Sequence, residues 1–238
     1  MFGHRHAIAP RGRDEGEKPF WISFADLMTA LMVLFLLVMS VALLAVTRTI
    51  SERERLESQR QDAIEQLLGR IEKAAERQPG VHVDRNRAVI DFGDRARFDT
   101  SSHTLSPEQE RLLRAFVPEV LTIARDKAGK RWLKRIVVEG FTDRRGSYLY
   151  NLNLSLQRSQ RVLCALMARP GPDERAMSRS ELEEVRRLFL VGGYSSNSAR
   201  ESLDASRRIE LRLEFFGVEE PAASEAAGYQ GEFGLCAL

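Results

Sequence analysis

One carboxylate lies at a place in the chain where lipid normally excludes charge. Asp26 directly precedes residues 27–46, a run that contains no charged residue and only two polar ones, Thr29 and Ser40. A helix needs roughly 20 apolar residues to cross a bilayer. Because an ionised carboxylate is costly there, we expect Asp26 to favour its protonated form and to need a polar partner. It could carry a proton or cation between subunits, or it could lie at the interface and cap the helix N-terminus.

A hydroxyl lies one helical turn further along. Thr29 follows Asp26 by three positions, which places both side chains on one face of a helix. The hydroxyl could hydrogen-bond the carboxyl or line a hydrated path, or it could bond back to a carbonyl of its own helix. Asp26 and Thr29 are therefore our candidate ion-translocating residues.

The apolar run separates regions of different composition. Residues 1–19 are rich in Gly, Pro and charge, and Arg5, Arg11 and Arg13 among them favour a cytoplasmic N-terminus. Residues 20–46 form the predicted transmembrane helix. Because the run is too long for a signal peptide and no clean cleavage site follows it, we expect an uncleaved membrane anchor.

Residues 47–80 predict a helical linker. Charged residues and good helix formers fill this segment until Pro79 and Gly80 end it. A short apolar stripe along the linker could pair with a second copy of the chain. The stripe consists of Ile64, Leu67, Ile71 and Ala74.

From residue 81 to residue 216 the pattern predicts one mixed α/β domain. Hydrophobic and charged residues alternate over 209–215, which is the period of a half-buried strand. Ser106 and Ser178 each begin a capping box that opens a helix. Residues 217–238, rich in Ala, Glu and Gly, predict a loose tail. We also expect a hairpin formed by residues 81–84 and 88–92, strands at 136–141 and 188–193, and a helix at 151–168.

The composition argues against several functions. The 238-residue chain has a net charge of only +2, which gives no field for binding nucleic acid. We find no nucleophilic triad, metal-ligand cluster or phosphate loop in the sequence, so we expect neither an enzyme nor a bound cofactor or metal. Cys164 and Cys236 could pair in an extracytoplasmic domain. Free thiols are the simpler expectation, because Cys236 lies in a tail of unknown path.

The sequence around Asp26 resembles a known family. Trp21-Ile-Ser-Phe-Ala-Asp26-Leu-Met-Thr29-Ala is similar to the single membrane span of the MotB-type stator subunits of ion-driven motors. In that family an aromatic anchor precedes an Ala-Asp-Leu/Phe-Met-Thr-Ala core whose Asp carries the ion. The resemblance implies that role for Asp26, with a proton as the ion. It also implies a MotA-like membrane partner that forms a pentameric ring around two copies of this chain, a homodimer.

A second set of residues resembles the OmpA-like peptidoglycan-binding domain over residues 81–215. That family's pattern is Thr-Asp-x-x-Gly, then Asn-x-x-Leu-Ser-x-x-Arg, then Arg-Arg-Ile/Val-Glu. The resemblance implies a β-α-β-α-β order, hence an α+β fold in which one mixed sheet is covered by helices. The pattern falls here on Thr142-Asp143-x-x-Gly146, on Asn151-x-x-Leu154-Ser155-x-x-Arg158 and on Arg207-Arg208-Ile209-Glu210.

The same resemblance implies a binding site for the diaminopimelate stem of peptidoglycan. Arg158 would hold a free carboxylate with its guanidinium fork, and Asp143 would hold the amine. Asn151 would position the loop between them. Taken singly, Asp143 could be only a turn residue and Arg158 only a solvated helix charge. The remaining candidates are Thr142 and Leu154 of the motif, and Asp99 in an earlier loop near the ligand.

Together the two modules predict a cell-wall-anchored stator subunit. It would cross the bacterial inner membrane once and hold its C-terminal domain in the periplasm. Three classes remain open: a subunit of the Zorya anti-phage defence system, a flagellar torque-generating stator, or a structural wall tether without an ion path. Residues 17–36 resemble the MotB-like subunit of the Zorya system most closely, so a Zorya stator is our hypothesis. Residues 169–187 are longer than the family's loop, and the sequence assigns them no role.

Overall fold

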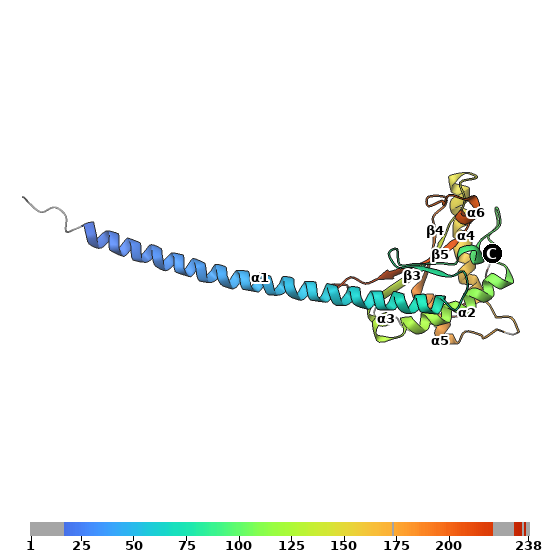
Figure 1. Cartoon of the computed structure of the whole chain (residues 1–238), viewed down its shortest axis with the longest axis horizontal. Coiled ribbons are helices and arrows are strands. Elements are labelled where there is room, and N and C mark those ends of the chain that lie inside the picture. The colour runs from blue at the N-terminus through green and yellow to red at the C-terminus, as the bar shows by residue number, and fades with distance from the viewer. Residues whose placement is uncertain (1–16, 173, 221–230, 235, 237–238) are drawn as a thin grey trace, which may run out of the picture. The chain divides into compact units, whose positions relative to one another are not determined.

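The computed structural model describes residues 17–172, 174–220, 231–234 and 236 (Figure 1). The predicted arm at residues 1–19 therefore lies almost wholly outside the described residues, as does most of the predicted tail. The chain divides into two compact units, Met1–Leu56 and Glu57–Leu238.

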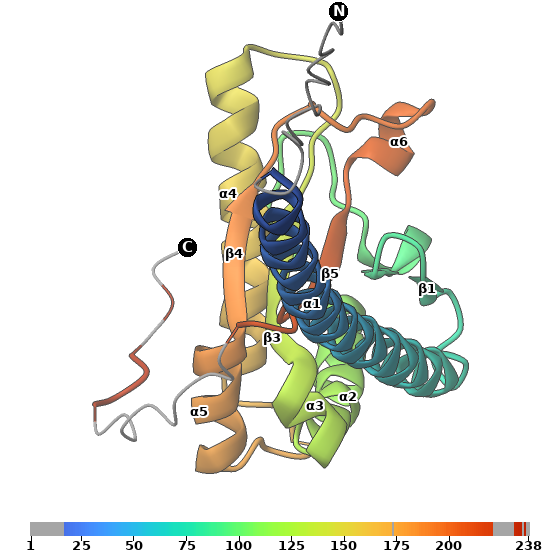
Figure 2. The same cartoon turned by 90° about the vertical axis from the view of Figure 1, so that its left-hand side faces the viewer.

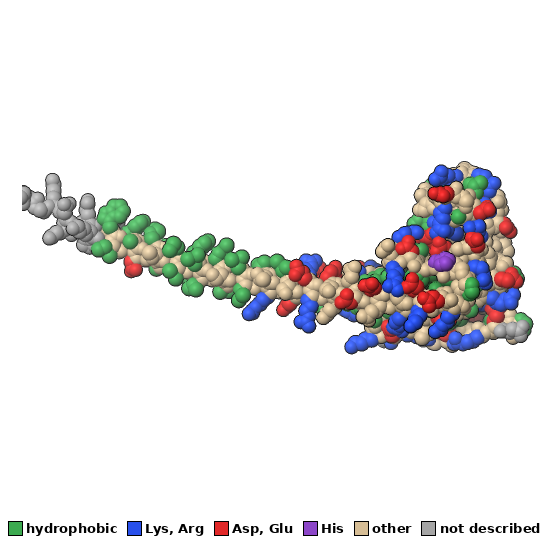
Figure 3. All heavy atoms as spheres, in the orientation of Figure 1, with side chains coloured by type: hydrophobic (Ala, Val, Ile, Leu, Met, Phe, Trp, Pro, Cys, Tyr) green, Lys and Arg blue, Asp and Glu red, His purple; other side chains and the backbone are tan. Residues whose placement is uncertain are grey.

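The first unit contains the apolar part of helix α1 (Glu17–Ala75). Its most apolar window has a mean hydropathy of 2.8, and within the described residues this is the one helix apolar enough to cross a membrane. All side chains from Trp21 to Leu56 are exposed, and Figure 3 shows hydrophobic side chains around this part of the helix. A helix that is apolar on every side matches a lipid environment rather than water.

Hydroxyl groups in the apolar part of α1 bond to their own helix. Thr29 Oγ1 donates to the carbonyl of Asp26 at 2.8 Å, and Ser40 Oγ donates to the carbonyl of Leu36 at 2.7 Å. These bonds satisfy polar groups that have no water to bind inside a membrane. The Thr29 hydroxyl is therefore bonded to a backbone carbonyl of its own helix and not to the Asp26 carboxyl.

The C-terminal part of α1 belongs to the second unit. The apolar stripe predicted along the linker packs into the core of this unit, together with Leu68 and Ala75. Arg60 Nε adds a bond of 2.6 Å to the carbonyl of Phe216, and Glu72 forms an ion pair with Arg85. The end of the helix is thus part of the domain's own hydrophobic core.

A five-stranded mixed sheet forms the centre of the second unit. Its order is β1-β2-β5-β3-β4, with β3 and β4 parallel and the other pairs antiparallel. In Figure 2 strands β4, β3 and β5 run side by side. The strands are β1 (His82–Asp84), β2 (Val89–Asp91), β3 (Leu133–Gly140), β4 (Phe189–Gly193) and β5 (Ile209–Phe215). The sequence-based prediction of an α+β fold with a mixed sheet is confirmed.

The longer helices of this unit begin at serine caps. The capping boxes predicted at Ser106 and Ser178 are both present. Ser147 caps α4, so that helix begins three residues before the predicted start at Asn151. The short helices α3, α6 and η1 were not predicted, because elements of four to six residues carry no periodic signal. The helices are η1 (Gly93–Ala96), α2 (Pro107–Ala124), α3 (Lys127–Trp132), α4 (Tyr148–Met167), α5 (Arg179–Leu188) and α6 (Leu203–Ser206).

Two glycines allow α4 to lie directly on the sheet. A Cβ atom on Gly140 would lie only 2.0 Å from the carbonyl oxygen of Ser155. A Cβ atom on Gly193 would lie 2.6 Å from Leu156 Cγ. Only glycine permits this approach, which brings the first half of α4 against the ends of β3 and β4.

A disulfide joins Cys164 of α4 to Cys236, with their Cα atoms 5.7 Å apart. The expectation of free thiols was wrong. The described part of the tail returns to α4, where Phe233 and Cys236 line a cavity together with Leu163 and Met167. This return path, which the composition of the tail did not show, brings the two cysteines together.

Candidate functional site

Most of the predicted wall-binding residues line one small cavity, of about 30 Å³. It lies where β3 ends and α4 begins. Of the six candidates, the five that belong to the motif between Thr142 and Arg158 line it, whereas Asp99 does not. The lining residues are Thr100, Ser101, Thr142, Asp143, Arg145, Tyr150, Asn151, Leu154, Arg158 and Arg207.

Arg158 is fully buried and donates to three backbone carbonyls in two separate segments of the chain. Its Nε donates to the carbonyl of Ser102 at 2.9 Å, Nη1 to that of Phe141 at 2.7 Å, and Nη2 to that of Asp99 at 3.1 Å. The guanidinium also lies 4.9 Å from the ring centroid of Phe98. It is therefore not the solvated helix charge that its sequence position also allowed.

Burial and, to a smaller extent, the nearby charge of Arg207 lower the pKa of Arg158 to about 10, while Asp143 acts in the opposite direction. The group still carries its charge at neutral pH. A guanidinium has five N–H groups, and the three bonds to carbonyls leave one N–H on each terminal nitrogen without a partner among the described residues. Arg158 lines the cavity and keeps these two N–H groups for a further acceptor, for which a carboxylate is suited by its charge.

Asp143 is buried to 6% exposure and is held by two arginines. Arg145 donates to it from Nη2 at 3.0 Å and from its backbone N–H at 2.9 Å, and Arg207 donates from Nη1 at 3.2 Å. Burial alone would raise the pKa of Asp143, but the hydrogen bonds from Arg145 and Arg207 outweigh it and hold the pKa below its ordinary value. Asp143 is therefore an anion in this site.

Asn151 fixes the loop that carries Asp143. Its Nδ2 donates to the carbonyl of Asp143 at 3.3 Å and to that of Arg145 at 2.9 Å. Gly146 turns the same loop with a φ of +95°, a conformation that favours glycine. The arrangement matches the positioning role that the sequence analysis gave to Asn151.

Thr142 contributes a hydroxyl that has no partner among the described residues. The side chain is 2% exposed, and its Oγ1 is buried without a hydrogen bond. A buried polar atom without a partner is costly. The backbone N–H of Thr142 is bonded to the carbonyl of Ser195 at 3.0 Å, so the residue itself is firmly placed. Thr142 lines the cavity, so this unpartnered hydroxyl belongs to a residue at the site.

The structure adds two site residues that the sequence analysis did not single out. Arg145 and Arg207 both line the cavity and both bond Asp143. Arg145 belongs to the Thr-Asp-x-x-Gly motif as an unspecified position, and Arg207 is the first residue of the Arg-Arg-Ile-Glu motif, two residues before β5. Asp99, by contrast, contributes its backbone carbonyl to Arg158 while lying outside the cavity lining.

The side chains of the neighbouring residues Arg207 and Arg208 make different contacts. Arg207 faces the cavity and bonds the carbonyl of Phe98 through Nε at 2.9 Å. Arg208 bonds Glu210 at 2.7 Å and lies 4.2 Å from the ring centroid of Phe141. Only the first arginine of the pair therefore lines the site.

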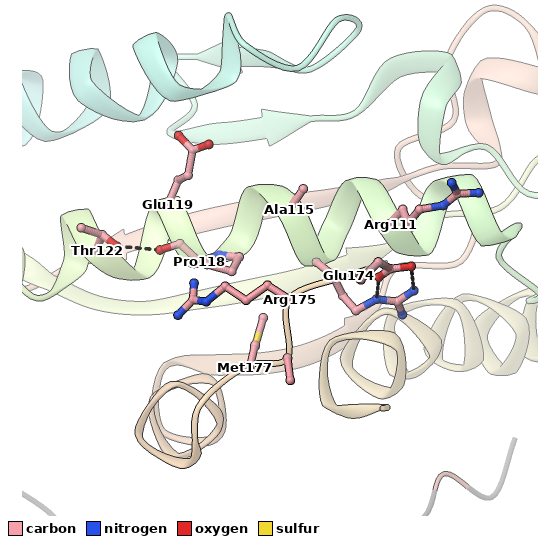
Figure 4. A pocket seen from close by; sticks show the side chains of 10 residues that line it. Arg111, Ala115, Pro118, Glu119, Thr122, Glu174, Arg175 and Met177 are labelled. Carbon is pink, nitrogen blue, oxygen red and sulfur yellow. Dashed lines mark hydrogen bonds and ion pairs between the residues drawn. The ribbon is translucent and has the colours of Figure 1, made fainter. Parts of the chain in front are cut away.

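A second, larger cavity of about 470 Å³ lies between α2 and residues 174–177 (Figure 4). Glu174 bonds Arg114 of α2 in a bidentate manner, at 2.5 and 3.1 Å, and Arg175 pairs with Glu181. These contacts fasten the segment that the sequence analysis left without a role. Its charges are already paired, so we do not take this cavity as the candidate site.

The membrane carboxylate is the second candidate. Asp26 shares one helix face with Ser23 and Ala30, and with these it borders a hollow on α1. Among the described residues the structure has no group of three or more His, Cys, Asp or Glu side chains that could hold a metal ion.

The family comparisons divide the chain into the same two modules. The model of the OmpA family matches residues 97–227, and the model described as membrane MotB of the proton-channel complex MotA/MotB matches residues 5–48. Two solved structures are similar at a TM-score of 0.37. The OmpA-like domain of a Francisella tularensis protein is 14% identical, covering 58% of this chain and 83% of that one. The periplasmic domain of Helicobacter pylori MotB is 16% identical, covering 54% and 83%.

A MotB-type membrane segment followed by an OmpA-family domain defines the class as a MotB-like stator subunit. Zorya protein ZorB of Escherichia coli is 47% identical over 221 residues, which cover 92% of this chain and 90% of that protein. The chain therefore belongs to the ZorB family, and the predicted class is confirmed.

Proposed function

We propose that this protein is the cell-wall-anchored stator subunit of a proton-driven inner-membrane motor in a Zorya anti-phage defence complex. The kinship with ZorB supports the defence system over a flagellar motor. The chain performs no catalytic step: it carries an ion at one end and holds the wall at the other. It crosses the membrane once, with its N-terminus in the cytoplasm and residues 57–238 in the periplasm.

The membrane partner is a MotA-like subunit, whose pentameric ring surrounds two copies of this chain. The family model of residues 5–48 is described as belonging to a MotA/MotB complex, which supports such a partner. The apolar part of α1 also needs protein neighbours around its one carboxylate. Ser23 and Ala30 border the hollow at Asp26, and small residues allow another helix to come close.

Asp26 carries the proton. It is the one acidic side chain between Trp21 and Val46, so a charge held there depends on what surrounds it. Protonation removes the charge and lets the side chain enter an apolar surrounding, whereas release of the proton requires a polar one. As Asp26 alternates between an apolar and a polar surrounding, the passage of protons is coupled to movement of the partner ring. Thr29 lines this path, while its hydroxyl remains bonded to the Asp26 carbonyl at 2.8 Å.

The cavity beside Asp143 binds the diaminopimelate end of a peptidoglycan stem. Three arginines and one aspartate line it, which favours a ligand with carboxylates and one amine. A ligand carboxylate accepts from the two remaining N–H groups of Arg158 and from Thr142 Oγ1. The ligand amine takes the place of Arg145 on Asp143. The observation that carries this proposal is the buried, unpartnered hydroxyl of Thr142 beside the fork of Arg158.

Arg145 must move for the ligand to enter. A cavity of about 30 Å³ holds about one water molecule. The Arg145 side chain is 55% exposed, whereas that of Arg207 is 13% exposed, so Arg145 is the group that can swing into solvent. Without that side chain, Asp143 keeps the hydrogen bonds from Arg207 and from the backbone N–H of Arg145, and its Oδ2 can accept from the amine instead.

Two assays on full-length variants separate the two halves of the proposal. Asp26→Asn should abolish phage protection while the protein still sediments with purified wall sacculi. Arg158→Ala should lose sedimentation with sacculi. Protection that survives in Asp26→Asn would refute the ion-carrier role, and unchanged sedimentation of a folded Arg158→Ala protein would refute the wall site.

A further inference from the structure

Three exposed residues form a patch at the edge of the cavity. Tyr148, Leu149 and Tyr150 make up the first turn of α4, with exposures of 54%, 72% and 47%. Tyr150 also lines the cavity, so the patch and the cavity are continuous. Large apolar side chains gathered on the surface of a soluble domain mark a binding surface.

The patch is held rigidly. Ser147 caps the helix by accepting from the backbone N–H of Tyr150 at 3.4 Å, and Ser195 Oγ donates to the carbonyl of Tyr148 at 3.2 Å. Gly146 leaves room beneath Tyr150, since a Cβ atom there would lie 3.2 Å from Tyr150 Cδ1. The two tyrosine side chains are therefore presented to solvent from a fixed backbone. This favours binding, because little backbone conformational entropy is lost when a ligand binds.

If the proposed function is right, the length of the peptidoglycan stem peptide indicates which chemical group lies against the patch. A stem of three residues spans about 10 Å when fully extended. If its third residue lies against Asp143 and Arg158, the sugar to which the stem is attached must lie within about that distance of the cavity. The patch begins at the cavity edge and so lies within this reach.

The chemistry of the patch fits an uncharged sugar. Residues 147–151 contain no charged side chain, whereas the cavity carries three arginines and one aspartate. Tyrosine offers a flat apolar face together with a hydroxyl, a combination suited to surfaces that are apolar and hydrogen-bonding at once. We propose that Tyr148, Leu149 and Tyr150 bind the glycan strand of the wall, next to the cavity that binds its peptide.

The test compares two soluble ligands on the full-length protein in detergent. One is the tripeptide L-Ala-γ-D-Glu-diaminopimelate, and the other is the same tripeptide on an N-acetylglucosamine–N-acetylmuramic acid disaccharide. The variant carries Tyr148→Ser with Leu149→Ser, and Tyr150 is left intact because it lines the cavity. A matched control is Leu190→Ser, which removes a 45% exposed leucine from β4.

We expect the wild type and Leu190→Ser to bind the disaccharide-tripeptide roughly tenfold more tightly than the free tripeptide. The double variant should lose this difference and keep its affinity for the free tripeptide. Equal preference for the disaccharide in wild type and double variant would overturn the glycan contact alone. A wild type that binds neither ligand would overturn the wall function beneath it. A double variant with unchanged affinities but an altered oligomeric state would show that the patch contacts a second copy instead.

Discussion

Arg158 Nη1 donates a hydrogen bond of 2.7 Å to the carbonyl of Phe141, the residue directly before Thr142 and Asp143. The side chain proposed to grip the ligand thus also holds the end of the strand that carries the other ligand contacts. Its bonds to the carbonyls of Asp99 and Ser102 extend this support to a third segment. The Arg158 guanidinium, whose charge is proposed to bind the ligand, is thus also a structural bridge. Its hydrogen bonds to three carbonyls allow this charge to stay buried.

Because Arg158 both supports the fold and is proposed to bind the ligand, Thr142 is the better residue with which to test the site. Thr142→Val removes a hydroxyl that has no partner among the described residues while keeping the shape of the side chain. We predict a free energy of unfolding unchanged or raised by about 1 kcal/mol, together with weaker binding to sacculi. Thermal unfolding and co-sedimentation measure the two effects.

Ser159→Ala is the matched control for Thr142→Val. Its buried hydroxyl donates to the carbonyls of Ser155 and Leu156 and lies outside the cavity lining. The change should lower stability by about 1 kcal/mol and leave binding intact. Wall binding by Thr142→Val at the wild-type level would count against a ligand at this hydroxyl.

Gly140→Ala should separate α4 from the sheet. The added Cβ atom would meet the backbone oxygen of Ser155 at 2.0 Å, so the helix must shift. We predict a loss of at least about 3 kcal/mol in the free energy of unfolding, with loss of wall binding as Arg158 leaves its carbonyls. Urea titration measures it.

Gly69→Ala provides the contrast for Gly140→Ala. At Gly69 the Cβ atom would come no closer than 3.4 Å to Arg85 Nη2. Since alanine favours helix, this change should be neutral or stabilising by up to about 1 kcal/mol. Equal effects of the two alanines would contradict the close packing of β3 and α4.

Acid should weaken the domain through its paired carboxylates. The pKa of Asp143 is lowered because hydrogen bonds from Arg145 and Arg207 outweigh burial, and the pKa of Glu174 is lowered by its hydrogen bond to Arg114. A carboxyl whose pKa is lower in the folded state stabilises the protein above its unfolded pKa, about 4, and loses that contribution as the pH falls further.

The melting temperature should therefore stay nearly level from about pH 7 to about pH 5 and fall below about pH 4. Asp143→Asn should make this fall shallower, because one titrating carboxyl has gone. The measurement is thermal unfolding at a series of pH values. A melting temperature that rises as the pH drops below 4 would contradict the assigned pKa directions.

The disulfide between Cys164 and Cys236 should contribute to stability. It closes a sequence separation of 72 residues, for which the chain-entropy estimate is about 4 kcal/mol. We predict that Cys164→Ser with Cys236→Ser lowers the free energy of unfolding by about 2–4 kcal/mol. Reductant should lower the wild type similarly and leave the double variant unchanged. Two free thiols in the oxidised, folded wild type would disprove the bond.

Much of the fold could be predicted because the signals are local. The capping boxes that begin at Ser106 and Ser178 each span four residues and predict the start of a helix. The alternation of apolar and charged residues over Ile209–Phe215 is enough to predict a strand. The disulfide could not be predicted, because it depends on where a tail with little pattern of its own returns. Nor could the sequence show that the stripe containing Leu67 and Ile71 packs in the domain core.

The site divides in the same way. Asp143, Asn151 and Arg158 stand in a dense motif, so a resemblance finds them. Arg145 occupies an unspecified position of that motif, and Arg207 lies 64 residues from the Asp143 that it bonds. Their roles depend on the loop after β3 lying close to the segment between α6 and β5, which only the folded chain defines.

The ion path is tested most directly by proton influx into vesicles. The full-length chain is reconstituted with its MotA-like partner, and acidification inside the vesicles is followed with a pH-sensitive dye after assembly of each complex has been verified. Ser40→Ala serves as a control, because the Ser40 hydroxyl bonds only its own helix among the described residues. We expect wild-type influx for Ser40→Ala, partial influx for Asp26→Glu, and the rate of empty vesicles for Asp26→Asn. Wild-type influx through an assembled Asp26→Asn complex would contradict the central claim that this carboxyl carries the proton.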